Sequence, residues 1–111
     1  MITARVISSQ PANDDLDGIW DYLASEASPE VADFVIARLY EAMHRAAEAP
    51  LLHRTHSEYV GAPRRINVFN YAIFYDPLPE GDGIFVWRVL HGARDLPSLV
   101  HRPPRSKNRG S

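Results

Sequence analysis

The sequence predicts a single two-layer α+β domain in which a helix hairpin packs on one β-sheet. Two consecutive stretches, residues 14–27 and 29–49, repeat apolar side chains with the period of an α-helix, and only a residue or two separates them. Three strand-like stretches with short links follow, which predicts an antiparallel meander. With 111 residues, the chain is long enough to bury a core without covalent cross-links.

The first strand and the first helix are predicted from the opening residues. Alternating apolar side chains in residues 2–8 predict a short strand. Pro11 then indicates a turn, after which Asn13 or Asp14 is expected to cap a helix. Aspartates lie in the expected first turn, where they complement the positive end of the helix dipole. The apolar stripe has the spacing i, i+3, i+4, i+7 and consists of Leu16, Ile19, Trp20 and Leu23.

The second helix has clear signals at both ends. Ser28 is the expected N-cap, Pro29 suits the first helical position, and Pro50 closes the helix. Because the link between the two helices is so short, they are expected to form an antiparallel hairpin. Residues 51–63 have no sustained period and are interpreted as a connector, with a short strand around residues 58–60 as an open alternative.

The remaining strands are expected at residues 64–69, 71–75 and 84–90. The first two are joined around Asn70, which tolerates left-handed turn geometry. Residues 77–83 form a loop, and residues 96–100 are expected to add one docked turn. We therefore expect one domain over residues 1–100 and a basic, disordered tail over residues 101–111.

Composition limits the possible functions. The sequence has no cysteine, so disulfides, thiolate nucleophiles and cysteine-based zinc sites are excluded. His53 and His56 lack a nearby acidic ligand, so a solvated loop is a simpler interpretation than a metal site, and we expect no metal and no cofactor. No signal-peptide pattern or membrane-spanning segment is recognisable, which favours a cytoplasmic protein.

The net charge of −2 conceals an asymmetry along the chain. Residues 1–50 contain three Arg and nine acidic residues, whereas residues 51–111 contain nine Lys or Arg and five acidic residues. This pattern favours two surfaces with different partners, although an acidic, solvated helix pair would explain it equally well.

The pieces in this order resemble the ParE/RelE superfamily of bacterial toxins from toxin–antitoxin pairs. The resemblance extends over nearly all of residues 3–100. It is carried by the helix segment DLDGIWDYLA, the AEAP that ends the second helix (47–50), RRINVFNYAIFY (64–75) and RVLHGARDL (88–96). The closing His-Gly-x-Arg-Asp of residues 91–95 is more similar to the ParE branch than to the RelE branch.

The resemblance implies a sheet of about four strands, with the N-terminal strand beside the last strand. It also implies a ParD-like antitoxin as a partner in a hetero-oligomer, and DNA gyrase as the target that a ParE-type toxin binds and poisons. It implies neither a membrane partner nor sequence-specific nucleic-acid binding. The residues that we expect to contact the antitoxin lie on the helix hairpin and are Leu16, Trp20, Ile36 and Tyr40.

The polar end of the last strand is the expected target-binding site. The candidates are Arg94, Arg88, His91, Asp95 and Arg64, and Arg94 is the first choice because it has the fewest structural duties. Arg88 has an alternative structural role, as a half-buried arginine paired with an acid such as Asp76 or Glu58. His91 and Asp95 could instead pair with each other and hold the turn at Gly92.

Catalysis is the main alternative to binding. A RelE-type messenger RNA endonuclease would use Arg65, Arg88 and His91, with the arginines on the phosphate and the histidine as acid or base. No aromatic residue follows Trp87 in the sequence, which counts against a stacking site for a nucleobase. The favoured expectation is therefore a non-catalytic gyrase binder, and a non-toxic member that still binds its antitoxin is a third possibility.

Overall fold

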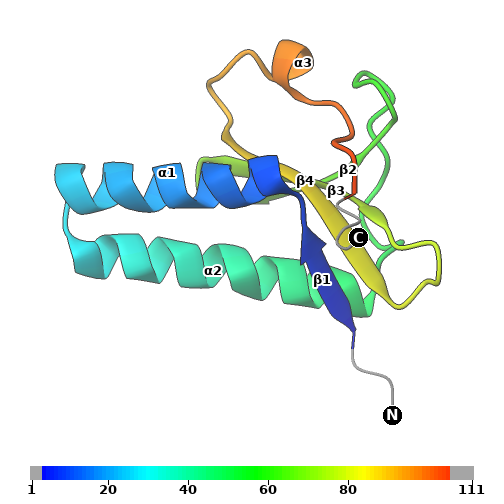
Figure 1. Ribbon diagram of the computed structural model, residues 1–111, viewed down its shortest axis with the longest axis horizontal. Helices are drawn as coiled ribbons and strands as arrows, with labels where there is room; N and C mark the ends of the chain where they lie inside the picture. Colours follow the sequence, from blue (N-terminus) through cyan, green and yellow to red (C-terminus); the bar gives the residue numbers. More distant parts are fainter. Residues whose placement is uncertain (1–3, 106–111) are drawn as a thin grey trace.

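A helix hairpin packs on one face of a four-stranded sheet in the computed structural model, which describes residues 4–105 (Figure 1). The elements in chain order are β1 (Arg5–Ser8), α1 (Gln10–Glu26), α2 (Pro29–Glu48), β2 (Arg64–Val68), β3 (Tyr71–Pro77), β4 (Gly83–His91) and α3 (Leu96–Leu99). The strand order is β1-β4-β3-β2, with β1 parallel to β4 and the other pairs antiparallel. The expected architecture, including the position of the first strand beside the last, is confirmed.

Helix α1 begins earlier than the sequence suggested. Ser9 is its N-cap, because the Ser9 hydroxyl accepts a hydrogen bond from the Ala12 amide at 3.0 Å. The expectation that Asn13 or Asp14 caps this helix is wrong, since Pro11 lies inside the first turn, where its missing amide hydrogen costs nothing. The aspartates therefore lie beyond the first turn.

Helix α2 follows the prediction closely. Ser28 caps its start by accepting from the Val31 amide at 3.1 Å, and Pro29 is the first helical residue. The last helical residue is Glu48, shortly before Pro50. The two helices run antiparallel, and the end of the hairpin where they join extends beyond the sheet (Figure 1).

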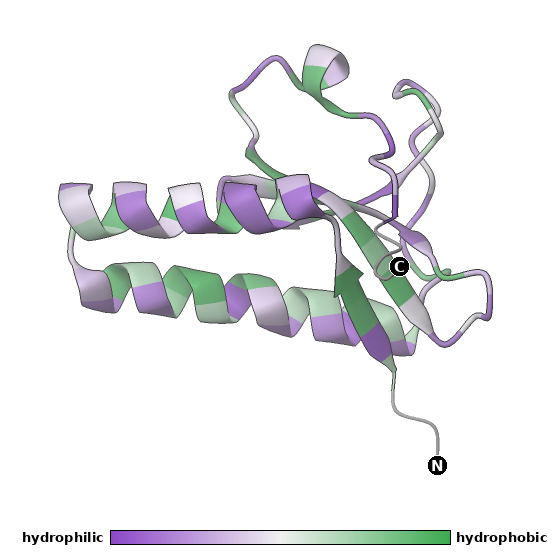
Figure 2. Ribbon diagram, in the orientation of Figure 1, coloured by the Kyte–Doolittle hydropathy of each residue, from purple (hydrophilic) through white to green (hydrophobic). Residues whose placement is uncertain are grey.

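The sheet separates two apolar cores. Strand β4, between them, is made mostly of hydrophobic residues (Figure 2). The core under the helices contains Leu16, Leu39, Met43, Ile73, Tyr75, Ile84, Val86 and Val89 among its buried side chains. The core on the opposite face contains Tyr59, Phe74, Leu78, Phe85, Trp87, Leu90, Leu96 and Val100. Because both faces are covered, β4 is a nearly continuous apolar run, as is typical of a central strand.

An irregularity in β4 changes which side chains share a face. Phe74 is paired with Arg88 and Tyr75 with Val86, so Trp87 is an extra residue in β4. Val89 consequently joins Val86 in the core under the helices, and Leu90 lies in the opposite core. Simple alternation, which would place Arg88 on one face with Ile84, Val86 and Leu90, is therefore wrong.

The opposite core is closed by the connector and by the C-terminal segment. Tyr59 of the connector packs edge-on against Phe74, with ring centroids 5.0 Å apart, and residues 58–60 form no strand. The docked turn is confirmed as α3. Arg102, in the part of the expected tail that the structure describes, pairs with Asp76 at 2.8 Å and lies over the ring of Trp87. Residues 106–111 of the expected tail lie outside the described residues, and the domain limit at residue 100 stays a prediction.

The β2–β3 turn uses an unexpected residue for its left-handed conformation. Phe69 has φ +53°, whereas Asn70 was expected to supply the tolerance for this geometry. A bulky side chain is disfavoured at positive φ, so the surrounding structure must hold Phe69 there.

Candidate functional site

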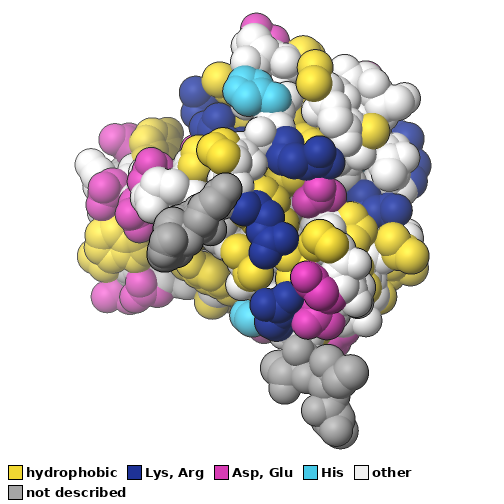
Figure 3. Space-filling view, turned by 45° about the vertical axis from the view of Figure 1, so that its right-hand side comes forward, with side chains coloured by type: hydrophobic (Ala, Val, Ile, Leu, Met, Phe, Trp, Pro, Cys, Tyr) yellow, Lys and Arg dark blue, Asp and Glu magenta, His cyan; other side chains and the backbone are white. Residues whose placement is uncertain are grey.

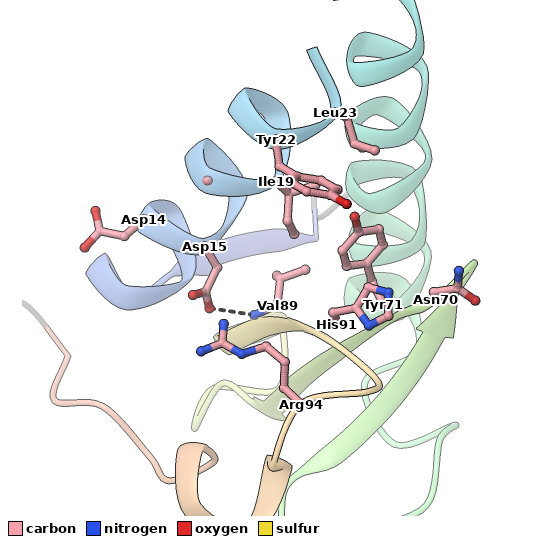
Figure 4. Close-up of a pocket in the computed structure, with 11 residues that line it drawn as sticks. Asp14, Asp15, Ile19, Tyr22, Leu23, Asn70, Tyr71, Val89, His91 and Arg94 are labelled. Atoms are coloured by element: carbon pink, nitrogen blue, oxygen red, sulfur yellow. Dashed lines mark hydrogen bonds between the residues drawn. The ribbon is translucent and has the colours of Figure 1, made fainter. Parts of the chain in front are cut away.

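A cleft lies between helix α1 and the end of strand β4 (Figure 4). It has a volume of about 730 Å³ and is lined by Asp14, Asp15, Gly18, Ile19, Tyr22, Leu23, Asn70, Tyr71, Val89, His91 and Arg94. We call this hollow the strand-end cleft. Gly18 leaves its α1 wall open, because an added Cβ at this position would meet no other atom within 4 Å.

Asp15, which lines the strand-end cleft, is paired with Arg88 of β4. The Arg88 guanidinium donates two hydrogen bonds to the Asp15 carboxylate, from Nε at 2.7 Å and from Nη2 at 2.8 Å. The amide of Val89 donates a third, at 3.0 Å. The side chains of Asp15 and Arg88 are only 10% and 20% exposed, and the hydrogen bonds to Asp15 raise the pKa of Arg88. The pair therefore fixes α1 to β4.

The position of this pair follows from the short first strand. Strand β1 ends at Ser8, opposite Val86, and leaves the next part of the β4 edge uncovered. The Ser9 hydroxyl donates to the Trp87 carbonyl at 2.7 Å, and Asp15 then accepts from the Val89 amide. Two side chains near the start of α1 thus continue the hydrogen bonding of the edge where the strand stops. The expected structural role of Arg88 agrees with this arrangement, but its partner is Asp15 and neither Asp76 nor Glu58.

Arg94 is a cation of the strand-end cleft, and its side chain has no hydrogen-bonding partner among the described residues. It is exposed, and its guanidinium makes no hydrogen bond or salt bridge within residues 4–105. Its side chain points toward the α1 wall of the cleft (Figure 4). Because its guanidinium makes no such contact, Arg94 can bind an external acceptor without first breaking an internal hydrogen bond.

His91 and Asp95 do not pair with each other, contrary to one of the expected arrangements. The Nδ1 atom of His91 accepts from the Ala93 amide at 3.1 Å, and its ring lies edge-on to Tyr71 with centroids 5.5 Å apart. Asp95 instead accepts from the Ser98 hydroxyl at 2.9 Å, at the start of α3. His91 therefore belongs to the cleft, whereas Asp95 serves the next turn. Burial is the main cause of the raised pKa of Tyr71.

A second, shallower hollow lies beside the strand-end cleft. It has a volume of about 450 Å³ and is lined by Arg65, Asn67, Phe69, Asn70, Tyr71, His91, Gly92 and Ala93. Two of the three candidate catalytic residues, Arg65 and His91, thus line one hollow. The third, Arg88, is not among the residues that line either hollow, and its guanidinium is held by Asp15.

Arg64 lies far from the other target-binding candidates along the strands. It is at the opposite end of β2 from the Phe69–Asn70 turn, and its guanidinium donates to the carbonyls of Leu51 and His53. Arg64 therefore fastens the connector and is not part of the strand-end cleft.

The residues expected to contact an antitoxin fall into two groups. Leu16 is 4% exposed and Ile36 is partly buried against the same core, so both contribute to packing. Trp20 is half-buried, and its indole donates to Asp33 at 2.8 Å, which links the two helices. Tyr40, at 40% exposed, is the most accessible of the four.

Sequence reasoning missed three contributors to this region: Asp15, Tyr22 and Phe69. The sequence indicates Asp15 only as part of an acidic helix start, because its partner is 73 residues away in the chain. The strand pattern of residues 64–69 includes Phe69. A large apolar residue next to Asn70, where a turn residue is expected, is the signal that could have identified it.

Charge is distributed unevenly over the surface. On the face shown in Figure 3, acidic side chains gather over the helix hairpin, whereas arginines, with a few acidic side chains beside them, gather over the rest of the face. Within residues 4–105, no cluster of three or more His, Asp or Glu side chains is arranged to hold a metal ion. No helix in this described part of the chain is both long and apolar enough to cross a membrane.

The comparisons with known proteins agree on the fold. A solved structure described as the chromosomal ParDE toxin–antitoxin system from P. aeruginosa matches this chain with a TM-score of 0.67 and 16% sequence identity. The match covers 80% of this chain and 96% of that one. The RelBE2 toxin–antitoxin complex from Mycobacterium tuberculosis matches with a TM-score of 0.53 and 16% identity, over 81% and 99% of the two chains.

Sequence comparison identifies the family. No curated protein matches the chain by sequence. A family model, however, matches residues 6–96, which is most of the chain. The model is described as the ParE toxin of the type II toxin–antitoxin system parDE. The matched residues include both long helices and all four strands except the first residue of β1. The chain belongs to the ParE toxin family of type II toxin–antitoxin systems.

Proposed function

We propose that this ParE-family toxin acts by binding and poisoning DNA gyrase, and that a ParD-like antitoxin neutralises it. Family membership supports the antitoxin as a partner, because the family is defined by the parDE pair. The gyrase target is the finer part of the proposal. The resemblance of residues 91–95 to the ParE branch implied gyrase as the target, and we assign the strand-end cleft as the surface that binds it.

The observation that carries the proposal is the contrast between the two arginines at the end of β4. Arg88 is neutralised by the two hydrogen bonds to Asp15, so it is poorly placed to stabilise a phosphate during bond cleavage. Arg94 has no partner within residues 4–105 and lines an open cleft. This arrangement favours binding of a partner protein over catalysis, with Arg94 as the main contact and His91 beside it.

Toxin induction in bacteria tests the proposal. A gyrase poison should trigger the DNA-damage response and produce linearised DNA while transcripts stay intact. Arg94→Ala should lose most of this effect, and Arg54→Ala is the matched control because Arg54 is also exposed but lies in the connector. Toxicity retained in Arg94→Ala would refute the assignment of the site.

A RelE-type messenger RNA endonuclease is the second candidate. The specific observation in its favour is that Arg65 and His91 line the same hollow, together with the aromatic ring of Phe69. In this case ribosome-bound transcripts would be cut after induction, and both Arg65→Ala and His91→Ala would prevent cleavage. If induction causes neither damaged DNA nor cut transcripts, the chain is instead a non-toxic, antitoxin-binding member.

A further inference from the structure

Two exposed aromatic rings lie together on the side of the molecule formed by α2 and the β2–β3 turn. Phe34 is 55% exposed and Phe69 is 60% exposed, and their ring centroids are 6.2 Å apart. The Arg38 guanidinium lies over the Phe34 ring, 5.3 Å from its centroid. We call these three side chains the Phe34–Phe69 patch. Neighbouring large apolar side chains left this accessible are typical of an interaction surface.

The backbone of Phe69 adds a second observation. This residue has φ +53°, a conformation that glycine or asparagine adopts far more readily than phenylalanine. The ring is not used to fill either core, since neither core includes it. An exposed aromatic side chain in a disfavoured backbone conformation contributes little to folding, which points to a role in binding.

A groove extends from the patch between α2 and strand β2. It has a volume of about 430 Å³, and its apolar lining comes from Ala42, Ile66 and Val68, with Phe69 at the turn. The charged side chains that line the groove are Arg38, Glu41 and Arg45. The Glu41 carboxylate forms a salt bridge with each arginine, at 2.9 Å to Arg38 Nη2 and 3.2 Å to Arg45 Nη2. The groove therefore carries a net positive charge and is complementary to an acidic ligand.

The patch adjoins the strand-end cleft. The Gly92 amide donates to the Asn70 carbonyl at 2.7 Å, which joins the β2–β3 turn to the end of β4. Phe69 and His91 also line the same shallow hollow. A chain bound over Phe69 would consequently stand next to Arg94 and His91 without having to enter the cleft.

We propose that the Phe34–Phe69 patch and its groove bind an acidic segment of the antitoxin, with an apolar side chain of that segment over the two rings. The inference rests on the proposed function in taking the antitoxin as the partner. It adds the binding surface and the chemistry of the segment. It also gives a reason for neutralisation, because the bound segment would obstruct a large target approaching the adjoining strand-end cleft.

The test uses the full-length toxin and the purified antitoxin encoded beside its gene. Phe69→Gly removes the ring and suits the positive φ, and Phe34→Ala removes the second ring without changing the turn. Each should weaken antitoxin binding by about 30-fold or more, as expected for aromatic residues at the centre of an interface. Leu52→Ser is the control, since Leu52 is 76% exposed but lies outside the patch, and its affinity should be unchanged.

Melting temperature shows whether the variants remain folded. In Phe69→Gly the relief at positive φ offsets the lost contact with Phe34, so its melting temperature should stay within a few degrees of the wild-type value or rise. Arg38→Glu, which reverses one groove charge, should weaken antitoxin binding most at low salt. Antitoxin affinities within twofold of wild type for both ring variants would overturn the inference. The inference would also be overturned if the ring variants bound the antitoxin normally but lost self-association, which would assign the patch to a second copy of the chain. Loss of target binding with unchanged antitoxin affinity would overturn it too, and would assign the patch to the target.

Gyrase inhibition measured with the same preparations separates this inference from the proposed function. If the wild-type toxin has no effect on gyrase but the ring variants lose antitoxin affinity, the proposed target is wrong and the patch assignment stands. If the toxin poisons gyrase but the ring variants bind the antitoxin normally, the patch assignment alone is wrong.

Discussion

Removal of the Asp15 carboxylate should destabilise the fold more than any other single change near the strand-end cleft. Asp15→Ala leaves the Arg88 guanidinium without its carboxylate, although one hydrogen bond to the Leu99 carbonyl remains. It also leaves the Val89 amide unpaired at the edge of the sheet. Because both side chains of the pair are at most a fifth exposed, the free energy of unfolding should fall by about 3 kcal/mol, at the lower end of the cost of breaking a buried pair.

Urea unfolding measures this loss. For a domain of this size, with an m value of about 1.5 kcal/mol/M, a loss of about 3 kcal/mol lowers the midpoint by about 2 M. Arg88→Met and the double variant complete a cycle, and the coupling energy should be at least about 1 kcal/mol because the two side chains contact each other directly. A midpoint within about 0.3 M of wild type for Asp15→Ala, or strictly additive effects in the cycle, would refute the account of how α1 is fixed to β4.

Two further predictions concern Tyr75 and Gly18. Burial raises the pKa of Tyr75 to about 12, whereas the pKa of tyrosine in the unfolded chain is about 10. The contribution of the neutral hydroxyl to the free energy of unfolding is therefore fully present below about pH 10. Roughly 2–3 kcal/mol of the free energy of unfolding is lost as the pH rises from 10 to 12. Tyr75→Phe should remove this part of the alkaline loss in a pH series of unfolding curves, without lowering stability at neutral pH, because the Tyr75 hydroxyl is buried without a hydrogen-bond partner among the described residues. Gly18→Ala should raise the free energy of unfolding by up to about 1 kcal/mol, since alanine favours the helix interior and its methyl meets no other atom. The same methyl narrows the strand-end cleft, so this variant should be less toxic despite its greater stability, and unchanged toxicity in a growth assay would place the target outside the cleft.

Local signals were sufficient for most elements of the fold. Ser28 and Pro29 define the start of α2 through contacts within one turn, so the sequence alone could identify it. The start of α1 was harder because Pro11 fits both a turn and a first helical turn, and the Ser9 side chain that decides between them also binds the distant Trp87 carbonyl.

The functional region depended more on contacts between distant residues. The extra residue in β4 changed which neighbours Arg88 has, and no periodicity in a single strand reveals an irregularity that is defined by pairing with β3. Asp15 meets Arg88 only when α1 crosses the end of β4. Arg94 could be singled out from the sequence because it has the fewest structural duties at the polar strand end, although the cleft that it lines also depends on α1 and Gly18.

An aromatic residue near the polar strand end is supplied by an earlier part of the chain. The sequence has no aromatic side chain after Trp87, but the β2–β3 turn brings Phe69 into the hollow that His91 lines. This proximity is a tertiary effect of the antiparallel pairing of β3 with β4, in which Tyr71 lies opposite His91. It is also the reason why the endonuclease alternative needs a direct test.

Gyrase-mediated DNA cleavage with purified components is the most direct test of the central claim. Wild-type toxin and Arg54→Ala are each incubated with gyrase and supercoiled plasmid, and the linear DNA released after denaturation is quantified. The account predicts that linear DNA accumulates with both proteins and falls at least tenfold with Arg94→Ala, while all three unfold at similar urea concentrations. Absence of linear DNA with the wild-type toxin, or equal amounts with Arg94→Ala, would contradict it.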